Sequence, residues 1–155
     1  MKPVKIAILS LTHGHTRKYY QTLNDNPKLD WVAVYAEDET VRKNFLAWGY
    51  NVPCYLTEKE MFERHPDIEA VVMASANIKH IGQFRECAKR GIHVLCMKIP
   101  TFDMQEYDEI ISLVKESGIV CQVELEMHYN PVVKRLYELT AEMETGKISS
   151  INATN

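Results

Sequence analysis

A short polar turn with two histidines follows the first apolar run of the chain. The turn spans residues 10–16 (SLTHGHT) and leads into an amphipathic stretch that is typical of a helix. A turn at this place can bind phosphates, because backbone amides at a helix N-terminus point toward an anion. The G-x-G-x-x-G fingerprint of dinucleotide loops is missing, since Ser10, Thr12 and His15 stand at its three positions and Gly14 is the only glycine. The motif alone therefore does not predict dinucleotide binding.

The two histidines of the turn, His13 and His15, have three interpretations. Imidazoles two residues apart can chelate a metal ion, but no third ligand follows at a suitable spacing, so no metal site is predicted. They can line a bound cofactor or substrate, where a protonated ring favours phosphate oxygens. They can also be ordinary loop residues. The candidate cofactor contacts in this turn are Ser10, Thr12, His13, Gly14 and His15.

Two acids, Glu37 and Asp38, follow the second apolar run. An acid about 20 residues beyond a phosphate loop commonly binds the ribose hydroxyls of NAD, and either residue fits that distance. Asp38 has the alternative of capping the next helix. Acids here disfavour the 2′-phosphate of NADP, whereas Arg42 and Lys43 on the following helix keep NADP possible.

Two later segments place polar side chains directly after buried-strand patterns. Ser75, Asn77 and His80 follow the run AVVMA, and they can orient a ribose or a substrate, although His80 can equally begin the next helix. Lys98 follows the run HVLC, where its charge must reach water or a partner. It can bond a substrate hydroxyl and position the carbon that gives up hydride. The alternative is a lysine that only extends its charge to the surface.

The elements that carry these residues alternate regularly. The predicted strands are Val4–Ser10, Trp31–Ala36, Pro53–Leu56, Ala70–Ala74, His93–Cys96 and Ile119–Glu124, with helical patterns between them. Their nearly continuous hydrophobicity favours a parallel sheet that is covered on both faces. The sequence therefore predicts an α/β fold, a doubly wound parallel sheet of the Rossmann type in three layers, with right-handed crossovers. Ligands bind such sheets beyond the carboxyl ends of the strands, so we expect the functional residues there.

Capping patterns mark several helix ends. The N-terminal signals are Thr57 and Asp103, each followed three residues later by a glutamate, and the C-terminal signals are Gly91 and Gly118. A last helix begins at Asn130-Pro131 and closes at Gly146. Residues 147–153 are predicted to form one more strand.

The composition excludes several classes of protein. The chain has 155 residues, 46% of them hydrophobic, and a formal net charge of −3, which gives no electrostatic reason to expect nucleic acid or an anionic membrane as partner. No apolar run reaches the roughly 18 residues of a membrane span, and no signal peptide is evident, so we expect a cytoplasmic protein. The four cysteines lie in or beside apolar segments and are predicted to be reduced, buried thiols.

Three segments together resemble the glucose–fructose oxidoreductase, inositol dehydrogenase and MocA family. EAVVMASANIKH (69–80) is similar to the strand-four stretch of that family, which ends T-P-N-x-x-H. RGIHVLCMKIP (90–100) is similar to its G-K-H-V-L-x-E-K-P block. Residues 119–139, followed by TGKISSI, resemble its passage from the Rossmann domain into the second domain. The resemblance covers essentially the whole chain.

The resemblance implies an NAD-dependent dehydrogenase, with NADP as a possibility, that acts on a secondary alcohol of a sugar or polyol. Lys98 matches the active-site lysine of the E-K-P motif. The strand-four cofactor loop corresponds to Ser75, Asn77 and His80, and the phosphate loop to residues 10–15. The chain departs from the family pattern at four places. Met97 replaces the glutamate of the E-K-P motif, and Ile99 is inserted before Pro100. The acid expected to bind the ribose is Glu37 instead of a residue at position 36, and the phosphate loop is poor in glycine, as it is in a histidine-rich branch of the family.

The resemblance also predicts the domain organisation. Residues 1–146 form the NAD(P)-binding domain, and residues 147–155 begin a second α/β domain that is otherwise absent. In the family that domain supplies the catalytic histidine and the oligomer interface, so we expect an inactive isolated fragment and a possible homo-oligomer of the full-length form. The alternatives are a non-catalytic nucleotide-binding or regulatory module, and a domain that binds no dinucleotide.

Overall fold

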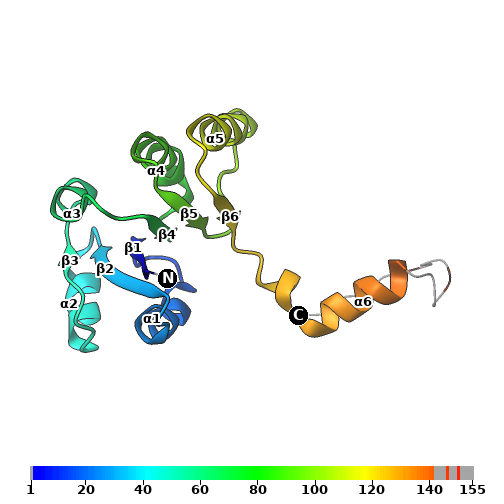
Figure 1. Ribbon diagram of the computed structural model, residues 1–155, viewed down its shortest axis with the longest axis horizontal. Helices are drawn as coiled ribbons and strands as arrows, with labels where there is room; N and C mark the ends of the chain where they lie inside the picture. The colour runs from blue at the N-terminus through cyan, green and yellow to red at the C-terminus, as the bar shows by residue number, and fades with distance from the viewer. Residues whose placement is uncertain (1, 142–145, 147–149, 151–155) are drawn as a thin grey trace. The chain divides into compact units, whose positions relative to one another are not determined.

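The computed structural model describes residues 2–141, 146 and 150 of the chain. These residues belong to two compact units, Met1–Glu124 and Leu125–Asn155 (Figure 1). The first unit contains all six strands and five of the helices. The candidate site residues named above all lie in this first unit.

Six parallel strands form one sheet in the order β3-β2-β1-β4-β5-β6. They are β1 (Val4–Leu9), β2 (Leu29–Tyr35), β3 (Cys54–Tyr55), β4 (Ala70–Met73), β5 (His93–Cys96) and β6 (Cys121–Val123). The six strands predicted between residues 4 and 124 are all present, with ends that differ by no more than two residues. The doubly wound parallel sheet is therefore confirmed, and the strand order reverses between β1 and β4.

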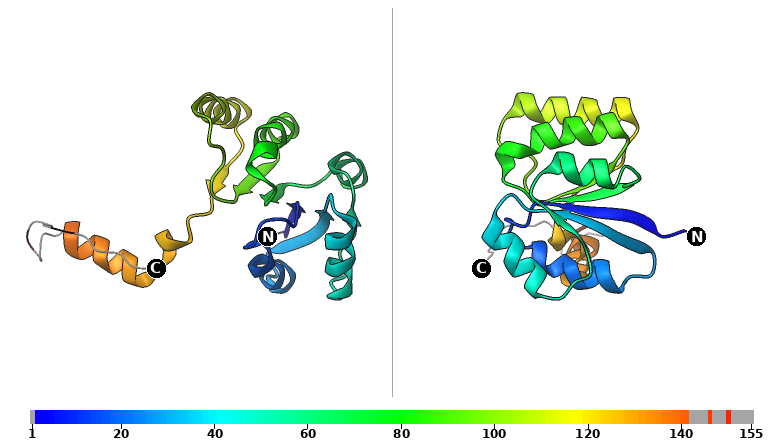
Figure 2. Two further views of the ribbon diagram at one scale, coloured as in Figure 1. Left: turned by 180° about the vertical axis from the view of Figure 1, so that it is seen from behind. Right: turned by 90° about the vertical axis from the view of Figure 1, so that its left-hand side faces the viewer.

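Helices cover both faces of the sheet. On one face lie α1 (Thr16–Asp25) and α2 (Glu39–Ala47), and on the other lie α3 (Glu58–Arg64), α4 (Asn77–Arg90) and α5 (Met104–Ser117) (Figures 1 and 2). The right-hand view of Figure 2 shows the three layers edge-on. This arrangement confirms the predicted three-layer architecture.

The sheet is buried on both faces because its central strands carry nearly continuous apolar runs. Along β1, Ile6 and Ile8 pack against the α1–α2 layer, whereas Ala7 and Leu9 pack against the α3–α5 layer. Successive side chains of a strand point to opposite faces, so a continuous apolar run fills two cores at once. Polar side chains are therefore displaced to the edges of the sheet.

The α1–α2 layer is held by an aromatic cluster around Phe45, whose side chain is fully buried. The Phe45 ring lies 5.5 Å from Tyr20, 5.7 Å from Trp31 and 6.0 Å from Tyr50, measured between ring centroids. Stacked and edge-to-face contacts of this kind add to the free energy gained by burial. The cluster fixes α1, and therefore the turn that precedes it.

The predicted helix ends are present. Thr57 and Asp103 are N-cap residues whose side-chain oxygens accept backbone amide hydrogens, from Glu60 and from Gln105 and Glu106 respectively. Gly91 and Gly118 end α4 and α5 in the left-handed conformation, which an L side chain would strain. The carboxylate of Glu106 does not return to its cap residue, because it accepts a hydrogen bond of 2.5 Å from Thr101.

The second unit consists, in its described part, of a 3₁₀ helix (Glu126–Tyr129) and α6 (Pro131–Ala141). The last predicted helix thus begins where expected, with the Asn130 side chain accepting the Val132 amide hydrogen at 2.8 Å. The strand predicted over residues 147–153 lies outside the described residues except for Ser150. This strand, and the second domain predicted after residue 146, therefore stay predictions. No helix among the described residues has the length and hydrophobicity that a membrane span needs.

The four cysteines are free thiols, as predicted. Cys54, Cys87 and Cys96 are buried, and Cys121 is half-buried at the edge strand β6. Burial raises the pKa of the Cys87 thiol to about 12, which keeps it protonated and unreactive.

Truncation of the central aromatic side chain tests the packing of this layer. We expect Phe45→Ala to lower the free energy of unfolding by about 3–5 kcal/mol, because it leaves a cavity in the cluster. The measurement is urea denaturation followed by circular dichroism. The matched control is Phe102→Ala, since Phe102 is 81% exposed, and it should change the stability by less than about 0.5 kcal/mol. Equal losses in the two variants would contradict the prediction.

Candidate functional site

The predicted segments meet along the carboxyl edge of the sheet. Each of them directly follows β1, β2, β4 or β5, and parallel strands end at the same edge. The turn after β1 is joined to the end of β4 by a hydrogen bond of 3.1 Å from the His13 amide to the Ala74 carbonyl oxygen. In doubly wound sheets the crevice between these two strands is where ligands bind.

Ser10 takes the backbone conformation for which dinucleotide loops use a glycine. It is fully buried and has a φ of 73°, the single positive φ among the described non-glycine residues. Its hydroxyl compensates for this strain by accepting the Thr12 amide hydrogen at 3.3 Å and by bonding the Thr12 hydroxyl at 3.0 Å. Gly14, by contrast, has room for a Cβ and no positive φ. A serine thus replaces the glycine at the position that needs it.

The start of α1 presents backbone donors beside the two histidines. The His15 amide donates to His13 Nδ1 at 3.2 Å, and the Thr16 hydroxyl donates to the His13 carbonyl oxygen at 2.6 Å. The Gly14 amide donates to none of the described residues, and no side chain caps α1. An unpaired amide at a helix N-terminus favours an anionic ligand.

Glu37 lies after β2 with one carboxylate oxygen unpaired. Oε1 accepts a hydrogen bond of 3.0 Å from Lys79 Nζ on α4, whereas Oε2 is buried and has no partner. Burial alone would raise the pKa of this carboxyl group, but the influence of its own backbone amide, of Lys79 and of Ser10 outweighs burial and lowers it. Glu37 is therefore an anion with a free acceptor. Asp38, in contrast, caps α2, with Oδ1 accepting from the Thr40 and Val41 amides at 2.8 Å each.

Two of the residues after β4 are buried and engaged with the protein. The Ser75 hydroxyl, in a residue that is 3% exposed, donates to Gln83 Oε1 at 2.5 Å. The His80 ring is 1% exposed and lies between two carbonyl oxygens, with Nδ1 2.8 Å from that of Pro100 and Nε2 3.0 Å from that of Ser75. These contacts tie the β4 segment to the segment after β5.

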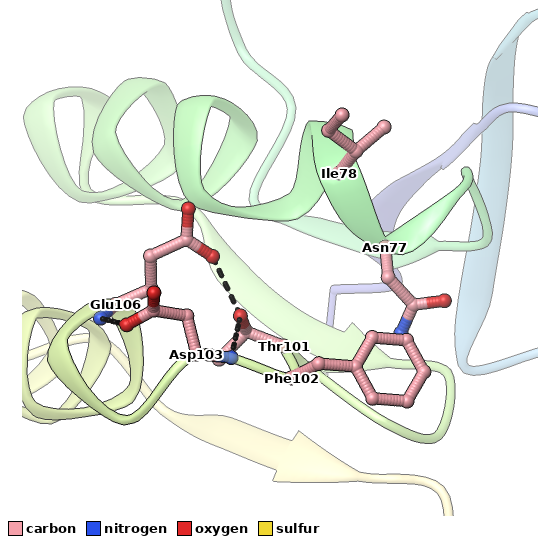
Figure 3. Close-up of a pocket in the computed structure, with 6 residues that line it drawn as sticks. All are labelled: Asn77, Ile78, Thr101, Phe102, Asp103 and Glu106. Carbon is pink, nitrogen blue, oxygen red and sulfur yellow. Dashed lines mark hydrogen bonds between the residues drawn. The ribbon is translucent and has the colours of Figure 1, made fainter.

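Asn77 lines a separate pocket beside the crevice. Its side-chain amide donates to the Ile99 carbonyl oxygen, which links the start of α4 to the segment that carries Lys98. The pocket has a volume of about 310 Å³ and lies between the first turns of α4 and α5. In Figure 3 the Asn77 side chain points toward the Phe102 ring, while Asp103 and Glu106 lie at the other end of the pocket.

Lys98 is exposed and forms no ion pair with any described residue. The preceding Met97 is fully buried in the α1–α2 core, so the position that bears a glutamate in the resembling motif contributes no charge here. His13 lies close enough to Lys98 to respond to its charge. The pKa of His13 is lowered first by burial, then by electrostatic interactions with His15, Lys98 and His80, while Glu124 opposes the change.

Glu124 was not identified from the sequence as a site residue. It follows β6, is 6% exposed, and places a carboxylate oxygen 3.4 Å from His15 Nδ1. The signal that identified Lys98, a charged residue directly after a buried strand, applies equally to Glu124. The distance between the two side chains of this pair, 109 positions apart in sequence, could only come from the fold.

The residues at this edge fit a dinucleotide. A ribose hydroxyl would supply the hydrogen that the buried Glu37 Oε2 lacks, and a phosphate oxygen would accept from the unpaired Gly14 amide. The Gly14 amide lies in the turn after β1, and Glu37 lies in the turn after β2. The structure thus brings the turn, Glu37 and Lys79 together, whereas Asp38, Ser75 and His80 are occupied by contacts within the protein.

Comparisons with known proteins agree with this arrangement. The chain is 23% identical over 122 residues to a trans-1,2-dihydrobenzene-1,2-diol dehydrogenase of Xenopus tropicalis, covering 79% of this chain and 37% of that protein. It is 25% identical over 121 residues to D-xylose 1-dehydrogenase (NADP(+)) 2 of Haloferax volcanii, covering 78% and 37%. The crystal structure of myo-inositol 2-dehydrogenase from Lactobacillus plantarum superposes with a TM-score of 0.82 at 23% identity, covering 95% of this chain and 43% of that one.

The chain therefore spans well under half the length of these proteins, and the solved structure shows the fold alone. A family model carries the assignment further. The model for the oxidoreductase family with an NAD-binding Rossmann fold matches residues 5–125, which include the turn after β1, Glu37, Lys98 and Glu124. The chain belongs to the glucose–fructose oxidoreductase, inositol dehydrogenase and MocA family, as its NAD(P)-binding Rossmann domain.

Proposed function

We propose that the protein binds NAD and serves an oxidoreductase that transfers hydride between NAD and a secondary alcohol of a sugar or polyol. The observation that carries the proposal is Glu37, an ionised side chain with a buried and unpaired oxygen at the carboxyl edge of the sheet. A carboxylate at this place is matched to the two ribose hydroxyls of NAD, which donate hydrogen bonds to it. The bound cofactor would supply the hydride chemistry, and the protein the orientation and the electrostatics.

The charges around Glu37 favour NAD over NADP. The 2′-phosphate of NADP would approach a carboxylate that is already ionised, and like charges repel. Arg42 and Lys43, the two cations that could bind the 2′-phosphate of NADP, form ion pairs with Glu39. Arg42 Nη1 lies 3.4 Å and Lys43 Nζ 3.8 Å from Glu39 Oε1. Lys79 is likewise paired, with Glu37 itself.

We assign Lys98 to the substrate. It follows β5 at the edge of the crevice, is exposed, and has no carboxylate partner among the described residues. An ammonium group held at this place can bond the hydroxyl of an alcohol and hold its carbon near the nicotinamide. The two named relatives act, by their names, on D-xylose and on a dihydrobenzene diol, which supports a polyhydroxylated substrate.

A non-catalytic nucleotide-binding module is the second candidate. It is favoured by Met97, which is fully buried where the resembling motif has a glutamate, and by the turn after β1, where serine, threonine and histidine replace glycines. Such a module would bind the dinucleotide and leave Lys98 without a role. The third alternative, a domain that binds no dinucleotide, is decided by the titration described next.

Neutralising Glu37 tests the cofactor site. We expect Glu37→Gln to weaken NADH binding by about 10- to 100-fold, because hydrogen bonds to a charged acceptor contribute about 1.5–3 kcal/mol. The measurement is a fluorescence titration with NADH and, separately, with NADPH. The preference for NADH over NADPH should shrink in the variant, since the repulsion of the 2′-phosphate is removed.

The control is Glu39→Gln, which removes the same charge from a more exposed acid on α2, with a side chain that is 48% exposed. It should leave the affinity for NADH within about twofold, since solvent screens an exposed charge. Unchanged NADH binding in Glu37→Gln would remove Glu37 from the site. Absence of NADH and NADPH binding in the unmodified protein would refute the proposed function.

Removing Lys98 distinguishes an enzyme from a binding module. We expect Lys98→Ala to lower kcat for oxidation of myo-inositol or D-xylose by about 100-fold or more, because a preorganised charge next to the reacting oxygen is lost. The affinity for NADH should change by less than about threefold. The control is Lys89→Ala, an exposed lysine at the far end of α4. Equal losses in kcat and in NADH affinity would make Lys98 a cofactor contact only.

A further inference from the structure

A buried carboxylate and a half-buried histidine lie together at the β6 end of the crevice. Glu124 is 6% exposed, and its amide is fixed by a hydrogen bond of 2.8 Å to the Cys96 carbonyl oxygen at the end of β5. His15 Nδ1 lies 3.4 Å from Oε1 and 3.5 Å from Oε2 of Glu124. A carboxylate removed from water needs a partner that donates hydrogen, and His15 is in place to be that partner.

The hydrogen-bond network gives His13 and His15 opposite tautomers. His13 Nδ1 accepts the His15 amide hydrogen, so a neutral His13 ring carries its hydrogen on Nε2. His15 Nδ1 faces the Glu124 carboxylate and carries its hydrogen there, so Nε2 of a neutral His15 ring holds a free lone pair. The pair therefore offers one donor and one acceptor to a ligand.

Further ionisable groups act on the His13 ring. His13 lies 5.0 Å from His15 between ring centroids, and Lys98 and His80 lie within electrostatic reach of His13. Burial and electrostatic interactions with His15, Lys98 and His80 lower the pKa of His13, which favours its neutral form. Glu124 opposes these effects and raises the pKa of His13. His15, whose side chain is 26% exposed, remains open to a ligand.

We propose that His15 and Glu124 form the proton-transfer pair of this domain, with His15 Nε2 accepting the proton of the substrate hydroxyl. The proposal rests on the proposed function, because it assumes an alcohol held at Lys98 and NAD⁺ as the oxidant. Bound NAD⁺ would accept hydride from the alcohol carbon together with the electron pair of the C–H bond. The O–H bond would break, and its electron pair would form the C=O bond. The hydroxyl proton moves to His15, and the resulting imidazolium is stabilised by Glu124 until water takes the proton.

The assignment follows the physical logic of a carboxylate-oriented base. A carboxylate bonded to one ring nitrogen fixes the tautomer that leaves the other nitrogen basic, and it stabilises the charge that develops. A base placed in this way contributes about 10²- to 10⁴-fold to rate. The distance of 3.4 Å is long for a hydrogen bond, as is common for catalytic contacts before a ligand is bound.

The tautomer of His15 is tested without any cofactor. Long-range ¹H–¹⁵N correlation spectra of the unmodified protein at high pH should show hydrogen on His15 Nδ1 and on His13 Nε2. In Glu124→Gln we expect the His15 signal to move toward the Nε2–H form, and the pKa of His13 to fall further because the opposing acid is lost. The control is Glu116→Gln, an exposed acid on α5, which should change neither ring. A bare Nδ1 on His15 in the unmodified protein would overturn the proposal.

The chemistry is tested by oxidation of myo-inositol and D-xylose with NAD⁺. We expect His15→Asn to lower kcat by about 100-fold or more and Glu124→Gln by about 10-fold or more, with the affinity for NADH within about threefold of the unmodified protein in both. The asparagine variant removes a half-buried ring from a surface turn, so it remains informative if Glu124→Gln does not fold. Retention of kcat within about threefold in His15→Asn would overturn the assignment.

The two proposals fail in different ways. A protein that binds NADH but oxidises neither probe has no working proton acceptor for these alcohols, which overturns the His15–Glu124 pair and leaves cofactor binding intact. A protein that does not bind NADH refutes the proposed function, and the step proposed here falls with it. The spectra of His15 then still decide whether Glu124 orients the ring.

Discussion

Burial of the sheet on both faces is the constraint on which the structure depends. The strands are short and parallel, and their side chains fill an α1–α2 core on one face and an α3–α5 core on the other. A polar group without a partner in either core lowers the free energy of unfolding, which is only a few kcal/mol for a domain of this size. Most of the polar side chains near the sheet therefore lie toward the ends of the strands, and at the carboxyl end the turns after β1, β2, β4, β5 and β6 all come together.

The charges at that edge fall into two acid–base pairs on opposite sides of the point where the strand order reverses. Glu37 and Lys79 lie on the β2 side, and Glu124 and His15 lie toward β6. Lys98, which follows β5, remains without a carboxylate among the described residues. The first pair leaves a buried oxygen free and the second leaves a ring nitrogen free, so each pair keeps one group for a ligand.

Several residues named from the sequence serve the structure in a way that periodicity could not reveal. Asp38 caps α2, and His80 bonds the carbonyl oxygens that flank the crevice, while Asn77 bonds the Ile99 carbonyl oxygen. The sequence shows which residue types follow a strand, but it does not show where their side chains point. Ser10 is the opposite case, because its positive φ places a glycine-like conformation where the fingerprint had seemed lost.

The pattern of apolar runs, capping residues and glycines was enough to determine the sheet, its helices and the edge at which function is found, since burial and local backbone preferences are encoded within a few neighbouring residues. The family followed from segments that are likewise continuous in the chain. The pairing of His15 with Glu124, the free oxygen of Glu37 and the buried state of His80 were decided by tertiary structure. Each depends on strands that are distant in sequence and are brought side by side only when the two cores close, and it is that closure which fixes the distances between their side chains.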